Sequence, residues 1–341
     1  MYKLILDCMG GDHSPFAQVE GAVVAVNNDK NLHIVLVGDK EQIMQALANK
    51  KYHAEQISIM HASEIISNDD VPTVAIKQKT DSSLVVALNE LRTNDEIVGI
   101  VSTGSTGAVL TGGFLKIGRL KGVSRPALCP ILPTIKGGIV ALCDSGANVD
   151  CKPINLVHFA VMASAYMQKV YGVENPRVGL LSVGVEDHKG NELTKQVFQM
   201  LKEQKDINFV GNMEARDMLS GDYDVIVADG FNGNIALKSA EGAIMSVLKL
   251  LKQGIKSSFF SKIGYLFMKK TFKNLKSTMD YNNNGGAVLL GCKKIVVKGH
   301  GASKPTSVRI CIEQAVRMYK SDLCSCIETE IGNLKVDENN D

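Results

Sequence analysis

The sequence has no run of about 18 uninterrupted apolar residues, so we expect no transmembrane helix. It also has no strong excess of one charge, because 38 Lys and Arg residues against 36 Asp and Glu residues leave a net charge of +2. This near-balance argues against a protein that coats nucleic acid, and we expect no nucleic-acid partner. An acid and two glycines follow the first residues too early for a signal peptide.

The eight cysteines are scattered through the chain without an export signal, which indicates free thiols in a reduced cytoplasm. Cys324 and Cys326 are two residues apart, but a zinc site needs further ligands at suitable spacing, and His300 is the nearest histidine. We therefore expect neither a metal nor a cofactor.

The overall composition is typical of a globular protein. The chain has 341 residues, of which 45% are hydrophobic and 22% charged, enough for one large domain or two ordinary ones. Short β-branched runs predict buried strands at residues 4–6, 34–37, 97–101, 139–142, 178–183, 225–228 and 295–297. Longer amphipathic stretches predict helices at residues 15–26, 82–91, 153–170 and 192–202.

Strands that alternate with helices predict an α/β fold, in which a mostly parallel sheet has helices on both sides. We predict a single α/β catalytic domain over residues 1–335. Residues 245–282 form a helical insertion that faces a membrane or a second copy of the chain, and residues 336–341 form a frayed polar tail.

Glycines gather where the predicted strands end, in six loops that also carry Asp, Asn, Lys, Ser or His. These glycines are Gly10, Gly11, Gly104, Gly107, Gly146, Gly184, Gly190, Gly230, Gly233, Gly299 and Gly301. Ligands of open α/β sheets bind at the carboxyl ends of the strands, where glycine lets the backbone turn and approach them. The six loops therefore predict one site at one edge, although tight turns alone also use glycine.

Two of these loops precede predicted helices and offer backbone amides to an anion. Residues 7–13 lack the G-x-G-x-x-G spacing of a dinucleotide site, and Asp12 could instead be a helix N-cap. Residues 102–108 offer uncharged hydroxyls, but no Lys follows their second glycine, so they do not form a P-loop. A simple strand–turn–helix joint is the alternative for this second loop.

Six motifs, in this order along the chain, resemble those of the bacterial phosphate acyltransferase family, the acyl-(acyl carrier protein):phosphate acyltransferases of phospholipid synthesis. The motifs are D-C-M-G-G-D-H at 7–13, T-G-A at 106–108, G-A-N-V-D-C-K-P at 146–153, K-G-N-E at 189–192, D-G-F-N-G-N at 229–234 and H-G-A-S at 300–303. The similarity runs from about residue 3 to about residue 319.

The resemblance implies a three-layer α/β/α fold akin to isopropylmalate dehydrogenase and phosphotransacetylase. It implies a homodimer that moves a long-chain fatty acyl group from acyl carrier protein to inorganic phosphate, giving acyl phosphate for phosphatidic acid synthesis. It also implies a cytoplasmic enzyme attached peripherally to the inner face of the cell membrane, near the downstream glycerol-3-phosphate acyltransferase of that membrane.

The implied reaction is attack of phosphate on a thioester carbonyl, which requires positioning and preorganised donors rather than a Ser or Cys nucleophile. We predict that Lys189 and the amides of Gly10 and Gly11 hold phosphate. Asn191, Asn232 and Asn234 orient phosphate or the carbonyl group, and Asp7 and Asp229 orient cations and amides. The remaining predicted phosphate or substrate contacts are Asp12, Ser105, Thr106, Gly107, Asn148 and His300.

His13, His188 and His300 are candidate general acids because of their loop positions, although a hydrogen-bonded structural histidine is the alternative for each. The chain departs from the family pattern at two places. Ser105 stands where an Asn is common, and Val185 stands where a Glu is common. A role that rests on the amide or on the carboxylate is weakened at those positions.

The near-balance of charge hides a basic segment. Residues 249–276 contain eight Lys residues and no Asp or Glu. Apolar residues are interleaved at helical spacing, and Gly264 is a place where the helix could break. Such a helix suits the surface of an anionic membrane, and a dimer contact is the alternative. The predicted membrane residues are Phe259, Phe260, Ile263, Leu266 and Phe267.

The acidic carrier protein is expected to bind this basic surface or a second one, formed by Arg119, Lys121 and Arg125. Two other functions are kept as alternatives. One is an NAD-dependent dehydrogenase on a related fold, which the missing dinucleotide fingerprint disfavours. The other is a membrane scaffold without catalysis, for which six polar glycine loops are more than is needed.

Overall fold

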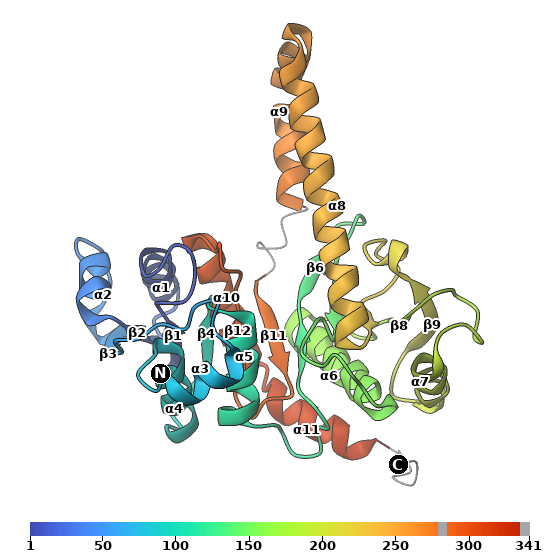
Figure 1. Ribbon diagram of the computed structural model, residues 1–341, viewed down its shortest axis with the longest axis horizontal. Coiled ribbons are helices and arrows are strands. Elements are labelled where there is room, and N and C mark those ends of the chain that lie inside the picture. Colours follow the sequence, from blue (N-terminus) through green and yellow to red (C-terminus); the bar gives the residue numbers. More distant parts are fainter. Residues whose placement is uncertain (279–284, 335–341) are drawn as a thin grey trace.

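The computed structural model describes residues 1–278 and 285–334, with side chains in the second helix of its long arm described up to Phe272. The predicted tail at 336–341 lies outside the described residues. The strands form two sheets, of seven and five strands, and most helices cover their faces (Figure 1).

The seven-stranded sheet is parallel over its first five strands, and β11 runs antiparallel to both of its neighbours. Its order is β3 (Ile57–His61), β2 (Leu32–Gly38), β1 (Tyr2–Asp7), β4 (Ile97–Ser102), β12 (Ile295–Lys298), β11 (Ala287–Leu290) and β5 (Ala127–Cys129). The five-stranded sheet is parallel except for β6. Its order is β6 (Ile131–Pro133), β7 (Ile139–Cys143), β10 (Val225–Val227), β8 (Val178–Ser182) and β9 (Phe209–Glu214).

The described α-helices are α1 (Phe16–Asn28), α2 (Lys40–Leu47), α3 (Pro72–Gln78), α4 (Ser83–Thr93), α5 (Thr106–Gly112), α6 (Pro153–Tyr171), α7 (Glu192–Glu203), α8 (Gly230–Ser257), α9 (Phe259–Thr278), α10 (Pro305–Lys320) and α11 (Leu323–Asn333). Every strand and helix predicted from the sequence is present, with ends that differ by a few residues. The prediction of a three-layer α/β/α fold is confirmed, and the structure adds that the strands divide into two sheets.

Helices on both faces explain why the central strands are mostly apolar. In β1, Leu4 and Leu6 belong to the core cluster that includes α1 and α10, whereas Ile5 belongs to the cluster that includes α4. In β10, Val225 and Val227 face the cluster of α6, whereas Ile226 faces that of α8. Successive side chains of a strand point to opposite faces, so both faces of each sheet are buried.

The strands that the sequence analysis missed are β3, β5, β6, β9 and β11. β5 and β6 have three residues each and are separated only by Pro130, which is too short a stretch to show a period. β9 contains Gly211, Asn212 and Glu214, residues that are uncommon in strands. Pairing with neighbouring strands forms these elements where their local sequence does not predict them.

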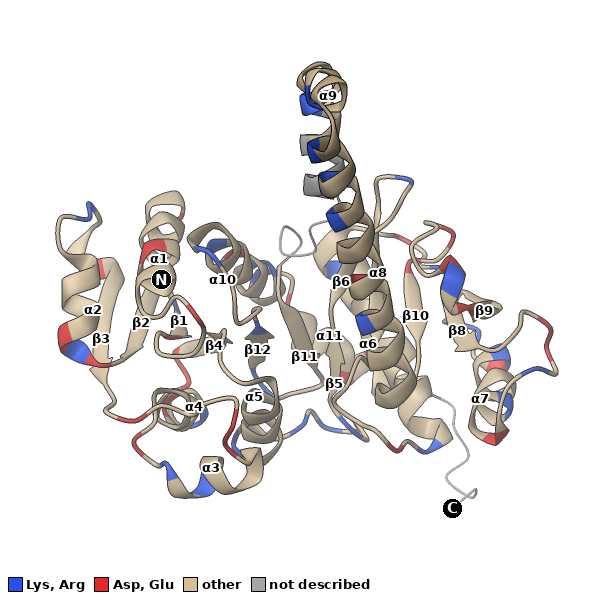
Figure 2. Ribbon diagram, turned by 45° about the horizontal axis from the view of Figure 1, so that its top comes forward, with Lys and Arg blue, Asp and Glu red and all other residues tan. Residues whose placement is uncertain are grey.

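A helical arm rises from the body between the two sheets, formed by α8 and by α9, which folds back alongside it (Figure 1). The helix breaks at Ser258, where φ is −140° and ψ is 158°, and not at Gly264, which lies within α9. The Ser258 hydroxyl accepts a hydrogen bond from the Ser261 N–H at 3.0 Å, as an N-cap does. Figure 2 shows Lys residues along the arm. Glu241 is the only acidic residue in the sequences of α8 and α9.

The first turn of α8 packs directly on the loop that follows β7. A Cβ atom at Gly233 would overlap the carbonyl oxygen of Asp144, and one at Gly230 would lie 2.5 Å from the carbonyl oxygen of Asn148. Glycine is therefore needed for the arm to start this close to the five-stranded sheet. Further along the same helix, Gly242 has open space where a Cβ would be.

Gly233→Ala should lower the free energy of unfolding by about 3 kcal/mol, because the added methyl group overlaps a backbone atom. Gly242→Ala is the matched control in the same helix and should stabilise the protein by up to about 1 kcal/mol, because alanine favours the helix. Urea unfolding of both variants measures this difference. Equal stability of the two variants would contradict the close packing of Gly233.

Candidate active site

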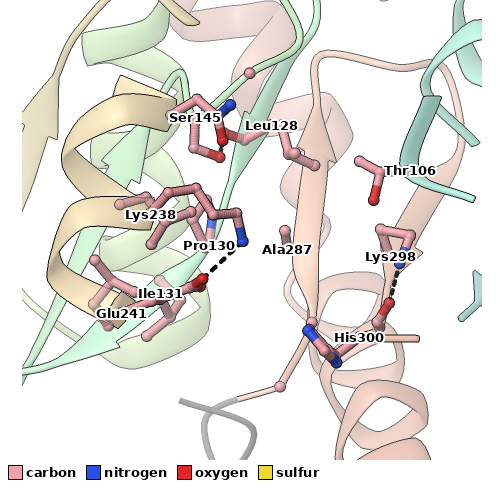
Figure 3. A pocket seen from close by; sticks show the side chains of 17 residues that line it. Thr106, Leu128, Pro130, Ile131, Ser145, Lys238, Glu241, Ala287, Lys298 and His300 are labelled. Carbon is pink, nitrogen blue, oxygen red and sulfur yellow. Dashed lines mark hydrogen bonds and ion pairs between the residues drawn. The ribbon is translucent and has the colours of Figure 1, made fainter. Parts of the chain in front are cut away.

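A cavity of about 320 Å³ lies between the two sheets, in the range of roughly 300–1,000 Å³ that small-molecule sites occupy. The residues that line it belong to both halves of the molecule. Lys298 ends β12 and His300 follows it, Ala287 begins β11, and Asn234 and Lys238 lie on the first turns of α8. Figure 3 shows the side chains of α8 and of β12 on opposite sides of the cavity.

The cavity is lined by both apolar and polar side chains. The apolar side chains are Leu128, Pro130, Ile131, Leu132, Leu237 and Ala287. The polar side chains are Thr106, Ser145, Asn234, Lys238, Glu241, Lys298 and His300. An elongated apolar ligand with an anionic or carbonyl group at one end matches this division.

Lys298 is a cavity residue that the sequence analysis missed. Its side chain is 8% exposed, and its ammonium donates a hydrogen bond to the carbonyl group of Gly299. Burial lowers the pKa of the Lys298 ammonium to about 8, and nearby Lys238 acts in the same direction. A Lys that closes a buried strand directly before a Gly-His-Gly turn was the signal that could have found it.

Lys238 was also missed, and it forms an ion pair with Glu241 at 2.7 Å, one turn further along α8. His300 accepts a hydrogen bond at Nδ1 from the Ala302 N–H at 3.1 Å, which places the proton of the neutral ring on Nε2. Partial burial lowers the pKa of His300, and Lys298 and Lys238 lower it further. Three basic side chains thus line the cavity, from α8, from β12 and from the turn after β12.

Asp7 holds together three segments of the chain close to Lys298. Its carboxylate accepts hydrogen bonds from the hydroxyls of Ser83 and Ser102, both at 2.7 Å, and from the Met9 N–H at 3.2 Å. The side chain is 1% exposed. Asp7 therefore ties together the ends of β1 and β4 and the start of α4. Its predicted role in orienting cations and amides at the site stays a prediction.

Gly10, Gly11 and Asp12 lie in the loop after β1 and do not line the cavity. A Cβ at Gly10 would lie 2.5 Å from the Cα of Gly104, so the loops after β1 and β4 touch through their backbones. The Asp12 N–H donates to the Gly301 carbonyl at 2.9 Å. The alternative of an Asp12 N-cap is wrong, because Pro15 holds the N-cap position of α1 and no side chain caps this helix.

Three of the four predicted asparagines have side chains engaged in local bonds. Asn191 caps α7 by accepting the Thr194 N–H at 2.9 Å. Asn232 donates to the Asp229 carboxylate at 2.6 Å, and that carboxylate also caps α8. Asn148 donates to the Pro126 carbonyl at 2.8 Å and to Asp144 at 2.9 Å. Asn234 alone of these four lines the cavity.

Thr106, Asn234 and His300 are the predicted site residues that the structure brings together around the cavity. Lys189 and His188 are exposed in the loop after β8, and His13 is exposed in the loop before α1. Ser105 and Gly107 flank Thr106 at the start of α5 without lining the cavity. The roles assigned to these residues stay predictions.

The predicted carrier-protein residues lie elsewhere. Arg119 and Lys121 line a shallow second cavity of about 470 Å³ together with Lys293, which is in the turn between β11 and β12. The first cavity is next to the start of β11 and the end of β12, whereas the second is next to the turn between them. The two cavities therefore lie at opposite ends of these two strands. Arg125 is exposed and donates to the Asp150 carbonyl at 3.0 Å.

Asp144 joins the two halves of the molecule beside the first cavity. It follows β7, and its carboxylate accepts five hydrogen bonds, from the N–H groups of Leu128, Gly146, Ala147 and Asn148 and from the Asn148 amide. Leu128 belongs to β5 of the other sheet. Burial raises the pKa of the Asp144 carboxyl, and the five donors oppose that increase by stabilising the charged form.

A family model described as fatty acid synthesis protein matches residues 2–326. A phosphate acyltransferase of Bacillus subtilis strain 168 is 44% identical to this chain over 336 residues, which cover 98% of this chain and 100% of the relative. A phosphate acyltransferase of Clostridioides difficile strain 630 is 42% identical over 338 residues, covering 99% and 98%.

Two solved structures share the fold. A phosphotransacetylase from Streptococcus pyogenes has a TM-score of 0.57 at 15% sequence identity, covering 97% of this chain and 94% of that one. A branched-chain phosphotransacylase from Enterococcus faecalis V583 has a TM-score of 0.53 at 14% identity, covering 94% and 100%. At these identities the likeness concerns the fold, and it agrees with the predicted phosphotransacetylase-like architecture.

Asp144→Asn should lower the free energy of unfolding by about 2–3 kcal/mol, because an amide cannot accept all five hydrogen bonds and leaves buried N–H groups unpaired. Asp150→Asn, at an exposed position of the same loop, is the control and should change it by less than about 0.5 kcal/mol. Urea unfolding measures both, and a similar small effect at Asp144 would show that it does not join the sheets.

Proposed function

We propose, from the premise that this chain belongs to the fatty acid synthesis protein family, that it moves a long-chain acyl group from the thioester of acyl carrier protein to inorganic phosphate. The curated relatives over nearly its whole length are phosphate acyltransferases, and the chain is accordingly an acyltransferase of fatty acid and phospholipid synthesis. The product of the proposed reaction is an acyl phosphate.

The observation that carries the proposal is the two-part lining of the cavity between the sheets. Its apolar side chains suit the acyl chain next to the thioester, and a basic side chain suits the phosphate dianion. Lys238 supplies a positive charge for the phosphate, and Lys298 and His300 supply proton-donating groups. Fixed donors close to a developing oxyanion stabilise the transition state of acyl transfer, and Thr106 and Asn234 are positioned on the cavity wall to provide them.

Direct attack by phosphate fits the side chains near the cavity better than a covalent acyl-enzyme. The Ser145 hydroxyl donates to the Leu128 carbonyl at 3.0 Å, and no base is recorded beside it among the described residues. Burial raises the pKa of the Cys151 thiol to about 11 and that of Cys143 well above the ordinary range. These thiols are therefore protonated at neutral pH and are poor nucleophiles.

Lys189 and Asn191 retain their proposed role as phosphate contacts under one condition. The loop that carries them, residues 183–191, must approach the cavity when substrate binds, since both side chains are exposed and Asn191 caps α7. Gly184 and Gly190 are the glycines within that loop. Gly190 has a φ of +116°, a conformation that other residues rarely adopt.

The enzyme should form acyl phosphate when it is incubated with long-chain acyl carrier protein and inorganic phosphate, and hydroxylamine should trap the product as a hydroxamate. The yield should depend on phosphate, and Lys238→Met should raise the KM for phosphate about tenfold because one cation that lines the cavity is removed. Lys195→Met, an exposed position on α7, is the control for loss of a charge.

Absence of a phosphate-dependent hydroxamate would refute the proposed reaction. Reduction of a nicotinamide cofactor in the same preparation would instead support a dehydrogenase. Release of carrier thiol without phosphate would indicate a hydrolase.

The arm supports the further proposal that the enzyme attaches to an anionic membrane surface. Phe260 and Phe267 are 83% and 86% exposed, and Lys262, Lys269 and Lys270 accompany them. Exposed aromatic residues beside lysines suit a helix at a lipid interface. No helix in residues 1–278 and 285–334 is long and apolar enough to span a bilayer.

A second copy of the chain is proposed to contact the other part of the arm. Met245, Val247 and Leu250 are exposed along α8. They lie between the cavity and the aromatic tip of the arm, where Phe259 and Phe260 begin α9. A homodimer that covers these residues leaves the tip available for lipid. A membrane position also brings the acyl phosphate close to the membrane glycerol-3-phosphate acyltransferase proposed to consume it.

The docking surface of the acyl carrier protein is proposed to lie on the arm side of the molecule. The lysines of α8 extend from the first cavity, whereas Arg119 and Lys121 lie at the opposite edge of the sheet from that cavity. A carrier bound at Arg119 would have to deliver its thioester around the sheet edge. The prediction that Arg119, Lys121 and Arg125 bind the carrier is kept as the second choice.

Substitution of Phe260 and Phe267 together by Ser should weaken binding to vesicles of anionic phospholipid at least about tenfold, because two aromatic rings no longer enter the lipid. Phe16→Ser is the control, since Phe16 is 56% exposed on α1 of the body. Vesicle flotation measures binding, and sedimentation reports the oligomeric state. A wild-type protein that stays with the soluble fraction would reject membrane attachment, and a dimer lost in the variant would assign the tip to a dimer contact.

A further inference from the structure

We propose that Lys298 is the proton donor to the thiolate that leaves when phosphate attacks the acyl thioester, a role that rests on the proposed function. The residue reaches the cavity from the last position of β12, between Ser102 of β4 and Ala287 of β11 in the sheet register. Its backbone is therefore held in a paired strand rather than in a loop, and its side chain lines the cavity.

The surroundings of Lys298 are unusual for a lysine. The side chain is 8% exposed, and among the described residues its ammonium forms no ion pair with a carboxylate. Its hydrogen bond to the Gly299 carbonyl satisfies one of three donors. A buried cation without a counter-ion is unfavourable, so the site favours either a bound anion or transfer of the proton.

The groups that face the Lys298 ammonium come from four elements. Asp7 lies on β1, but its carboxylate already accepts three hydrogen bonds, from two hydroxyls and one N–H. Cys311 lies on α10 and is itself buried, Lys238 lies on α8, and His300 follows in the next turn. The attraction of Asp7 and Cys311 is opposed by burial and by Lys238.

Together, these opposing effects set the pKa of the Lys298 ammonium at about 8, close to the value of about 8.5 for an ordinary thiol. A donor whose pKa lies near that of the leaving group and near the working pH transfers its proton efficiently. His300 is less suited to this step, because burial and the two lysines lower its pKa and leave the ring neutral at neutral pH.

The step balances without a further reactant. A phosphate oxygen forms a bond to the carbonyl carbon, and the tetrahedral intermediate collapses as the C–S bond breaks. The sulfur leaves with the bonding electron pair and takes a proton from the Lys298 ammonium. The neutral amine then takes the proton of the P–OH group of the acyl phosphate. The proton of hydrogen phosphate thus ends on the thiol, and Lys298 is restored.

The test compares two donors that carry the same acyl chain, an alkyl thioester and a phenyl thioester, whose thiophenol leaves without help from an acid. Lys298→Met should lower kcat about a hundredfold with the alkyl thioester and less than tenfold with the phenyl thioester. The KM for phosphate should change little. Lys195→Met, exposed on α7, controls for the loss of one charge.

Lys298→Arg keeps the charge and serves if the Met variant does not fold. The wild-type kcat should fall as the pH rises through about 8, because the donor must be protonated, and the Arg variant should move that fall to higher pH. Equal losses with both thioesters and a raised KM for phosphate would overturn the proposal and assign Lys298 to phosphate binding. A wild-type protein that forms no acyl phosphate would overturn the proposed function itself.

Discussion

The carboxylate of Asp144 is the contact on which the arrangement of this molecule depends. It lies at the end of β7 in one sheet and accepts the N–H of Leu128 on β5 in the other, while donors of its own loop bind both of its oxygens. Gly230 and Gly233 then allow α8 to start directly against that loop. This buried carboxylate therefore ties the two sheets to the loop against which the arm begins.

The cavity is a consequence of this joint. Its two walls come from different sheets, and only their fixed separation brings Lys238 of α8 to the same space as Lys298 of β12. A site assembled in this way combines apolar side chains with cations from both sides of the cavity, an arrangement that no single loop could provide. The chemistry of acyl transfer to phosphate needs both parts at once.

Much of the fold was predictable because the chain uses strong local signals. Runs such as Val178–Ser182 are apolar throughout, and Pro153 opens a helix where proline is tolerated. The short strands β5 and β6 were not predictable, since three residues carry no period and their pairing is decided by distant segments. The break of the arm at Ser258 rather than Gly264 shows that a capping hydroxyl ends a helix more effectively than a lone glycine.

The candidate site was predictable only in part, for a physical reason. Sequence motifs identify loops at strand ends, and they led to Thr106, Asn234 and His300. They cannot tell which asparagine of a motif caps a helix, as Asn191 does, and which faces the cavity. The sequence analysis missed Lys298 because a lysine at the end of an apolar strand usually marks the place where the strand reaches solvent. Only the three-dimensional structure shows that this lysine is buried.

Because α8 is one continuous helix, it sets a fixed distance between the cavity and the far end of the arm. The helix carries Lys238 on the cavity wall and runs unbroken to Ser257 beneath the aromatic tip, a separation of about 29 Å at 1.5 Å per residue. A helix is stiff along its axis, so whatever holds the tip also sets the height of the catalytic body above it. The length of this one helix thus sets the distance between the cavity and whatever surface or partner the tip contacts.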